Sequence, residues 1–163
     1  PLHKSATVIK VSCDGDHLDI DSPNLAMSDG KLLLETCYAK NQGSRMRTLR
    51  HSIQNGQAVA DMSQGHSSER LVWDFELDKP GTFHVSAECL NINSGNLKPR
   101  SIYLMVGEEE YSRRVSNDDL KNGQLALGEI KLKQAGTVSL KLRVEDGHGS
   151  PLYLKSLMLE KKE

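Results

Sequence analysis

Residues 70–89, RLVWDFELDKPGTFHVSAEC, have the clearest strand pattern of the chain, because two alternating runs flank a Lys-Pro-Gly turn. Each run keeps its apolar side chains on one side: Leu71, Trp73, Phe75 and Leu77 before the turn, and Phe83, Val85, Ala87 and Cys89 after it. Successive side chains of a strand point to opposite faces, so a period of two indicates half-buried β-strands. The segment predicts an antiparallel β-hairpin over about residues 70–90, with Trp73 in the core.

The same alternation continues on both sides of this segment. We expect further strands at 32–39, 45–53, 57–62, 100–106, 111–115, 125–132, 137–144 and 152–159, and one helical turn at 117–120 with Asn or Asp as its cap. About nine or ten strands with turn residues between them are typical of a sandwich or barrel. The sequence therefore predicts an all-β fold, an antiparallel jelly-roll β-sandwich at 31–163, after an N-terminal strand and linker-like segment at 1–30.

Length and composition restrict the classes of function. A chain of 163 residues is long enough for one domain with a proper core and short for two. Its formal net charge is −1, whereas nucleic-acid binding needs a marked cationic excess, so we expect no nucleic-acid partner. No apolar run approaches the roughly 20 residues that span a bilayer, so we expect no membrane span. The start at Pro1 without Met indicates a processed or excised fragment.

Residue types that commonly carry catalysis or bind metals are scattered along the chain. The three cysteines, Cys13, Cys37 and Cys89, have no CxxC or zinc spacing, although one disulfide among them stays open. The six histidines form no HxH or HExxH pattern, and no GxSxG, P-loop or GxGxxG motif occurs. These patterns favour a non-catalytic domain. A glycoside hydrolase stays open as well, because tertiary structure alone places its two carboxylates.

The order of the motifs resembles one family. Trp73-x-Phe75 followed by Pro80-Gly81-x-Phe83-x-Val85 is similar to the W-x-F-x-V-x-x-P-G-x-Y-x-V segment of galactose-binding-like β-sandwiches. Later segments fall in the same order: IYLMVG at 102–107, LGEIKLKQAG at 127–136 and LYLKSLMLE at 152–160. That family includes carbohydrate-binding modules of families six and thirty-five and the C-terminal domains of α-L-fucosidases and sulfatases. The resemblance covers roughly residues 31–160.

This resemblance implies a non-catalytic, carbohydrate-binding-like accessory domain of a secreted or periplasmic glycan-processing enzyme. Such modules stack sugars on aromatic rings, and only 4% of this chain is aromatic, so we expect weak sugar binding. The expected ligand-binding residues combine two tyrosine platforms with polar loop residues: Tyr103, Tyr111, Arg45, His66, Asn93 and His148. Families six and thirty-five often hold a structural calcium, for which the resemblance implies Glu35. The family's second acidic position is met here by Lys155 or Ser156.

A second interpretation gives the sandwich a structural role. In that case it packs against a neighbouring catalytic domain, such as that of an α-L-fucosidase or sulfatase, and binds no sugar. The partner is then the catalytic domain rather than a carbohydrate. An exposed apolar patch of several hundred Å² is the feature that would distinguish this role.

Overall fold

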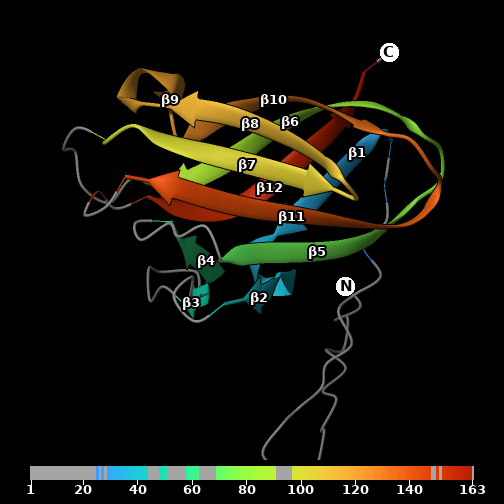
Figure 1. Ribbon diagram of the computed structural model, residues 1–163, viewed down its shortest axis with the longest axis horizontal. Coiled ribbons are helices and arrows are strands. Elements are labelled where there is room, and N and C mark those ends of the chain that lie inside the picture. Colours follow the sequence, from blue (N-terminus) through green and yellow to red (C-terminus); the bar gives the residue numbers. More distant parts are fainter. Residues whose placement is uncertain are drawn as a thin grey trace, which may run out of the picture.

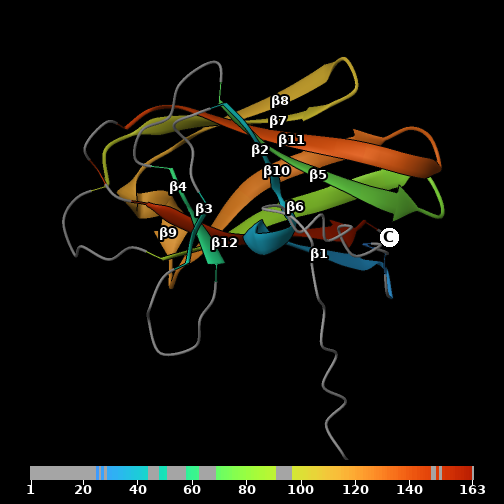
Figure 2. The same ribbon diagram turned by 90° about the horizontal axis from the view of Figure 1, so that it is seen from below.

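The computed structural model describes residues 25, 27, 29–43, 48–50, 58–62, 69–90, 97–147, 150 and 152–162. In these parts of the chain, two antiparallel sheets lie face to face (Figure 1). Figure 2, turned by 90°, shows the five-stranded sheet as the upper layer and the seven-stranded sheet as the lower one. The predicted all-β, antiparallel sandwich is therefore confirmed.

The larger sheet has seven strands within the described residues, in the order β3-β4-β12-β6-β10-β9, with β1 also on β12. Their bounds are Lys31–Glu35 for β1, Thr48–Arg50 for β3, Ala58–Asp61 for β4, Gly81–Leu90 for β6, Leu120–Lys121 for β9, Gln124–Leu132 for β10 and Tyr153–Lys161 for β12. β1 and β4 pair with opposite ends of β12, so the last strand lies in the interior of the sheet.

In the same described parts of the chain, the smaller sheet has five strands in the order β2-β5-β11-β7-β8. These are Lys40–Gln42, Arg70–Leu77, Gly136–Asp146, Arg100–Val106 and Glu109–Val115, respectively. Two 3₁₀ turns connect the sheets: η1, Thr36–Tyr38, between β1 and β2, and η2, Asn117–Asp119, between β8 and β9. The expected strand at 32–39 is shorter than predicted because η1 ends its regular pairing with β12.

The predicted hairpin at 70–90 is wrong in its pairing. β5 pairs with β2 and β11, whereas β6 pairs with β10 and β12, so the chain passes from one sheet to the other at Pro80. An alternating run specifies which face is buried but not which strand lies beside it. In a sandwich, the apolar faces of two consecutive strands can meet across the core instead of sharing one sheet. Trp73 of β5 and Phe83 of β6 belong to the same core cluster in this way.

Trp73 lies at the centre of that core, as predicted, and none of its surface is exposed. Its indole Nε1 donates a hydrogen bond of 2.8 Å to the backbone carbonyl of Glu35. A buried indole needs such a partner, so the bond fixes the end of β1 over the opposite sheet. Leu25 and Met27, which precede the expected domain boundary at Lys31, also pack against the core.

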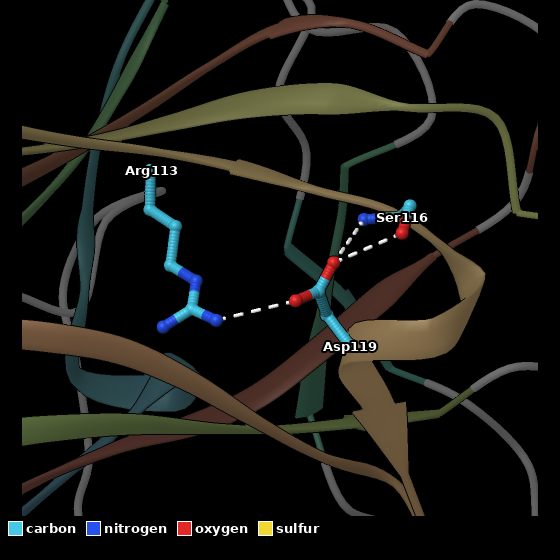
Figure 3. A network of polar contacts seen from close by, with 3 residues as sticks. All are labelled: Arg113, Ser116 and Asp119. Atoms are coloured by element: carbon cyan, nitrogen blue, oxygen red, sulfur yellow. Dashed lines mark hydrogen bonds and ion pairs between the residues drawn. The ribbon is translucent and has the colours of Figure 1, made fainter.

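The helical turn predicted near 117–120 is confirmed as η2, but the predicted Asn or Asp cap is wrong, because the capping residue is Ser116. Asp119 Oδ2 accepts hydrogen bonds from the Ser116 backbone N–H at 2.8 Å and from its hydroxyl at 2.9 Å. Its other oxygen accepts one from Arg113 Nη2 at 3.2 Å (Figure 3). These donors, the Ser116 N–H above all, lower the pKa of the Asp119 carboxyl. The cluster fixes the crossover from β8 to β9 at the edge of the sandwich.

Within the described residues, no helix is long and apolar enough to cross a membrane.

Candidate binding surface

The outer face of the five-stranded sheet places an aromatic ring beside a guanidinium group. Tyr103 is directly opposite Arg143 in the register of β7 and β11, and its neighbours Ile102 and Leu104 point into the core. The Arg143 guanidinium carbon lies 3.9 Å from the centroid of the Tyr103 ring. This is a cation–π contact, and it covers one side of the ring.

Two carboxylates complete the cluster around this arginine. Arg143 Nη2 donates to Glu110 Oε2 on β8 at 3.1 Å, and Nη1 donates to Glu145 two residues along β11. The Arg143 side chain is only 13% exposed, and its Nε is buried with no hydrogen-bond partner among the described residues. We call Tyr103, Glu110, Arg143 and Glu145 the tyrosine–arginine cluster. It offers a ring, fixed charge and several hydrogen-bonding atoms on one strand-supported surface.

The same face stays polar toward β5 and β2. Lys40 Nζ donates to Asp74 Oδ2 at 2.9 Å, and this bond is the main reason that the pKa of the Asp74 carboxyl is lowered. The Thr137 hydroxyl donates to Glu76 Oε1 at 2.6 Å. Cross-strand pairs of opposite charge or of hydrogen-bonding groups are typical of a sheet face that meets water. The outer face is therefore a broad polar surface on which Tyr103 provides an aromatic ring.

Tyr111, the second predicted platform, lies on the opposite side of its sheet. Its ring packs against the core, and its hydroxyl donates to Glu109 Oε2 at 2.6 Å and accepts from the Lys131 backbone N–H at 3.1 Å. The bond to Glu109 raises the pKa of the Tyr111 hydroxyl. Tyr111 thereby joins β8 to β10 at the edge of the sandwich. The structure does not bring it together with Tyr103 on one surface.

A buried arginine organises one end of the sandwich. Arg100, at the start of β7, has no exposed surface and donates from Nη1 to the Met62 carbonyl at 2.9 Å and from Nη2 to the Ser150 carbonyl at 2.8 Å. Burial lowers the pKa of its guanidinium. The Ser150 hydroxyl accepts from the Lys98 N–H at 3.1 Å. Together, these bonds hold three segments of the chain, at residues 62, 98–100 and 150, against one another.

Four of the predicted ligand-binding residues, Arg45, His66, Asn93 and His148, lie outside the described residues. The described positions on either side of His148 are Gly147 and Ser150, and both contact or approach Arg100. The part of the candidate site that the structure does describe is therefore the tyrosine–arginine cluster.

The described residues around Glu35 do not fit a calcium site. Calcium takes six to eight oxygen ligands. The Glu35 carbonyl accepts from the Trp73 indole. Of the two residues expected at the second acidic position, Lys155 forms an ion pair with Glu88, and Ser156 lies opposite Glu35 in the register of β1 and β12. No three His, Cys, Asp or Glu side chains gather as a possible metal site in the part of the chain that the structure describes.

No motif in the sequence marks Arg143 or Arg100 as a functional residue. The alternation at 137–144 places Arg143 on the outer face, but its contact with Tyr103 depends on the β7–β11 register, which no local pattern contains. Arg100 looks like any charged residue at a strand start, and its burial depends on two carbonyls from distant segments. Neither residue carried a signal in the sequence.

Comparison with known proteins shows the type of sandwich. No protein-family model matches the chain, and no curated protein matches it. A family 35 carbohydrate-binding module from Clostridium thermocellum has a TM-score of 0.57 and 13% identity over 81% of this chain and 98% of that one. One from Cellvibrio japonicus has a TM-score of 0.55 and 18% identity over 82% and 94%. The chain has the fold of these carbohydrate-binding modules.

The same fold also occurs inside longer proteins. The mosquito-larvicidal Cry4Aa toxin of Bacillus thuringiensis has a TM-score of 0.62 and 12% identity over 82% of this chain and 24% of the toxin. For the first four similar structures, this chain spans 18% to 28% of their length. At these identities the likeness establishes the fold, and the galactose-binding-like sandwich predicted from the motifs is confirmed.

Proposed function

We propose that this sandwich is a non-catalytic, carbohydrate-binding accessory domain of a glycan-processing enzyme, and that its sugar lies on the tyrosine–arginine cluster. The observation that carries the proposal is the placement of Tyr103 and Arg143 on the outer, polar face of the five-stranded sheet. The fold supports it, because isolated carbohydrate-binding modules match this chain over 94% to 100% of their own length. The proposal places the domain in a secreted or periplasmic protein, where it would meet extracellular polysaccharides.

The chemistry of the cluster suits a sugar. The carboxylates of Glu110 and Glu145 accept hydrogen bonds from hydroxyl groups, and the guanidinium of Arg143 donates them. The part of the Tyr103 ring that Arg143 leaves free can contact the apolar C–H surface of a pyranose. One partly covered ring gives a small contact area, so we expect dissociation constants of about 1 mM or weaker for short sugars.

Affinity gels and isothermal titration calorimetry test this function directly. β-(1,4)-Mannan and β-1,3-galactan are suitable probes, because the fold of this chain also occurs in 28% of a β-(1,4)-mannanase and in 30% of an exo-β-1,3-galactanase. We expect retardation of the wild-type domain, lost in Tyr103→Ala and in Arg143→Met. Tyr38→Ala is the matched control, since Tyr38 is an exposed tyrosine on η1, away from the cluster. Equal retardation of wild type and Tyr103→Ala would contradict the proposal.

A different observation favours the structural role. Leu33 on β1 is 45% exposed and lies directly opposite Met158 on the outer face of the seven-stranded sheet. Met158 lies opposite Ser86 on β6, and Ser86 lies opposite Ala126 on β10. These four residues form an uncharged strip that crosses four strands of that face. A neighbouring catalytic domain could cover such a strip. If the folded domain binds no glycan, but binds its parent catalytic domain and loses this binding in Leu33→Lys, the structural role is supported.

A further inference from the structure

A groove lies at the end of the sandwich where β7 turns into β8 and β10 turns into β11. Its volume is about 580 Å³, and it is partly open to solvent. That size falls within the usual range of small-molecule sites, about 300–1,000 Å³. The groove is lined by Val106, Leu132 and Val138 on its apolar side and by Glu109, Lys133 and Thr137 among its polar residues. We call it the end groove.

The end groove exists because two neighbouring strands have unequal lengths. β11 begins at Gly136, but its pairing with β7 begins only at Leu140, opposite Val106. From residue 136 to 139, the described strands pair with β11 only on the β5 side. Its other edge therefore faces the groove with backbone groups that can bond a ligand, since backbone N–H and C=O groups seek partners.

The polar rim is fixed and electrically balanced. Glu109 forms an ion pair with Lys133 and accepts a hydrogen bond from the Tyr111 hydroxyl at 2.6 Å. These bonds, the one from Lys133 above all, lower the pKa of the Glu109 carboxyl. The remaining charged lining residues are one acid and one base, Glu108 and Lys131. A neutral ligand with many hydroxyl groups fits this lining better than an ion does.

The groove also continues the surface of the tyrosine–arginine cluster. Ser139, which lines the groove, and Arg143 belong to the same strand and the same outer face. Four residues of a β-strand span about 13 Å, so the two sites are separated by a short stretch of polar sheet. Between them lies Lys141, which points to the same side of β11. A single extended molecule can therefore contact both sites.

We propose that the end groove is a second subsite, which binds one neutral sugar of a linear oligosaccharide whose other end lies on Tyr103 and Arg143. This inference rests on the proposed function and adds to it a preference for chain length. A ligand that reaches both sites gains the hydrogen bonds of the groove without a second loss of translational freedom. A ligand too short to reach the groove binds at the cluster alone.

Calorimetric titration with trioses and hexaoses of the β-(1,4)-manno and β-1,3-galacto series tests this inference. We expect one hexaose to bind about tenfold more tightly than the triose of its series, which corresponds to one or two hydrogen bonds. Thr137→Trp fills the groove from an exposed strand position that tolerates an aromatic residue. It should reduce hexaose affinity to that of the triose and leave triose affinity unchanged. Gln124→Trp, at an exposed position on the other sheet, is the matched control.

The outcomes separate this inference from the proposed function. If trioses bind and the hexaose of the series binds no more tightly, or if Thr137→Trp binds the hexaose as wild type does, the second subsite is refuted and the proposed function stands. If neither length binds the folded wild-type domain in either series, both proposals fail. Loss of triose binding in Thr137→Trp would also refute the separation into two subsites, since it would place the triose in the groove.

Discussion

Gly147 and Gly107 allow a direct test of how firmly Arg100 is held. Both glycines have a left-handed backbone, with φ of +73° and +60°. An alanine in that conformation costs about 1–2 kcal/mol at either site. A Cβ at Gly107 meets no atom within 4 Å, whereas a Cβ at Gly147 would lie 2.9 Å from Cζ and Nε of Arg100. Gly107→Ala is therefore a matched control that lacks only the contact with the arginine.

The additional loss of stability expected for Gly147→Ala comes from the hydrogen bonds of the Arg100 guanidinium. Arg100 is fully buried and is held by its bonds to the Met62 and Ser150 carbonyls. A hydrogen bond to a charged group contributes about 1.5–3 kcal/mol, so displacing the guanidinium enough to weaken one of them adds about 2 kcal/mol. We expect Gly147→Ala to lower the free energy of unfolding by about 3–4 kcal/mol, and Gly107→Ala to lower it by about 1–2 kcal/mol.

Urea unfolding followed by far-UV circular dichroism measures both values on the same scale. In an Arg100→Ala background, the contact is absent, and Gly147→Ala should cost no more than Gly107→Ala does. Equal destabilisation by the two alanines in the wild-type background would refute the reasoning. So would an excess at Gly147 that persists without the arginine, because Arg100 would then not be the group that the new methyl displaces.

Other predictions concern the core, an edge and a thiol. Trp73→Phe should lower the free energy of unfolding by about 2–4 kcal/mol, because it leaves a cavity and removes the partner of the Glu35 carbonyl; a value below 1 kcal/mol by urea unfolding would contradict this. The lowered pKa of Asp119 stabilises the fold above the unfolded-state value near 3.9, so the deficit of Asp119→Asn at pH 7 should shrink as pH falls through 4, and a constant deficit would argue against it. Burial raises the pKa of the Cys89 thiol to about 12, so at pH 8 this thiol should resist alkylation until urea unfolds the protein; labelling of native protein, detected by peptide mass spectrometry, would contradict that burial.

Much of the fold could be predicted from alternation because burial is a local property of a strand. The runs around Trp73 and Phe83 identified two strands and their buried faces correctly. Their pairing could not be predicted, since the partners β11 and β12 lie far away in the sequence and share the same pattern. Turn residues such as those before Gly81 are compatible with a hairpin and with a crossing between sheets alike.

The candidate site was less predictable than the fold. The position of Tyr103 opposite the apolar face of its strand could be predicted from the period of two. Its partner could not, because Arg143 reaches it through the register of two strands, and a slip of one residue would turn the arginine to the other face of the sheet. Tyr111 shows the same limit: its position after an acidic turn suggested an exposed platform, but its side chain faces the core.

The position of β12 in the interior of its sheet also determines when the protein can fold. Among the described strands, β1 pairs with β12 alone, β6 pairs with β12 and β10, and β5 pairs with β11 and β2. Neither sheet can be completed until these late segments have left the ribosome, and strand pairing between distant segments is slow, in the range of milliseconds to seconds. The apolar faces of the earlier strands therefore stay exposed to solvent during synthesis. Removing even the final strand should therefore abolish folding altogether rather than trim an edge.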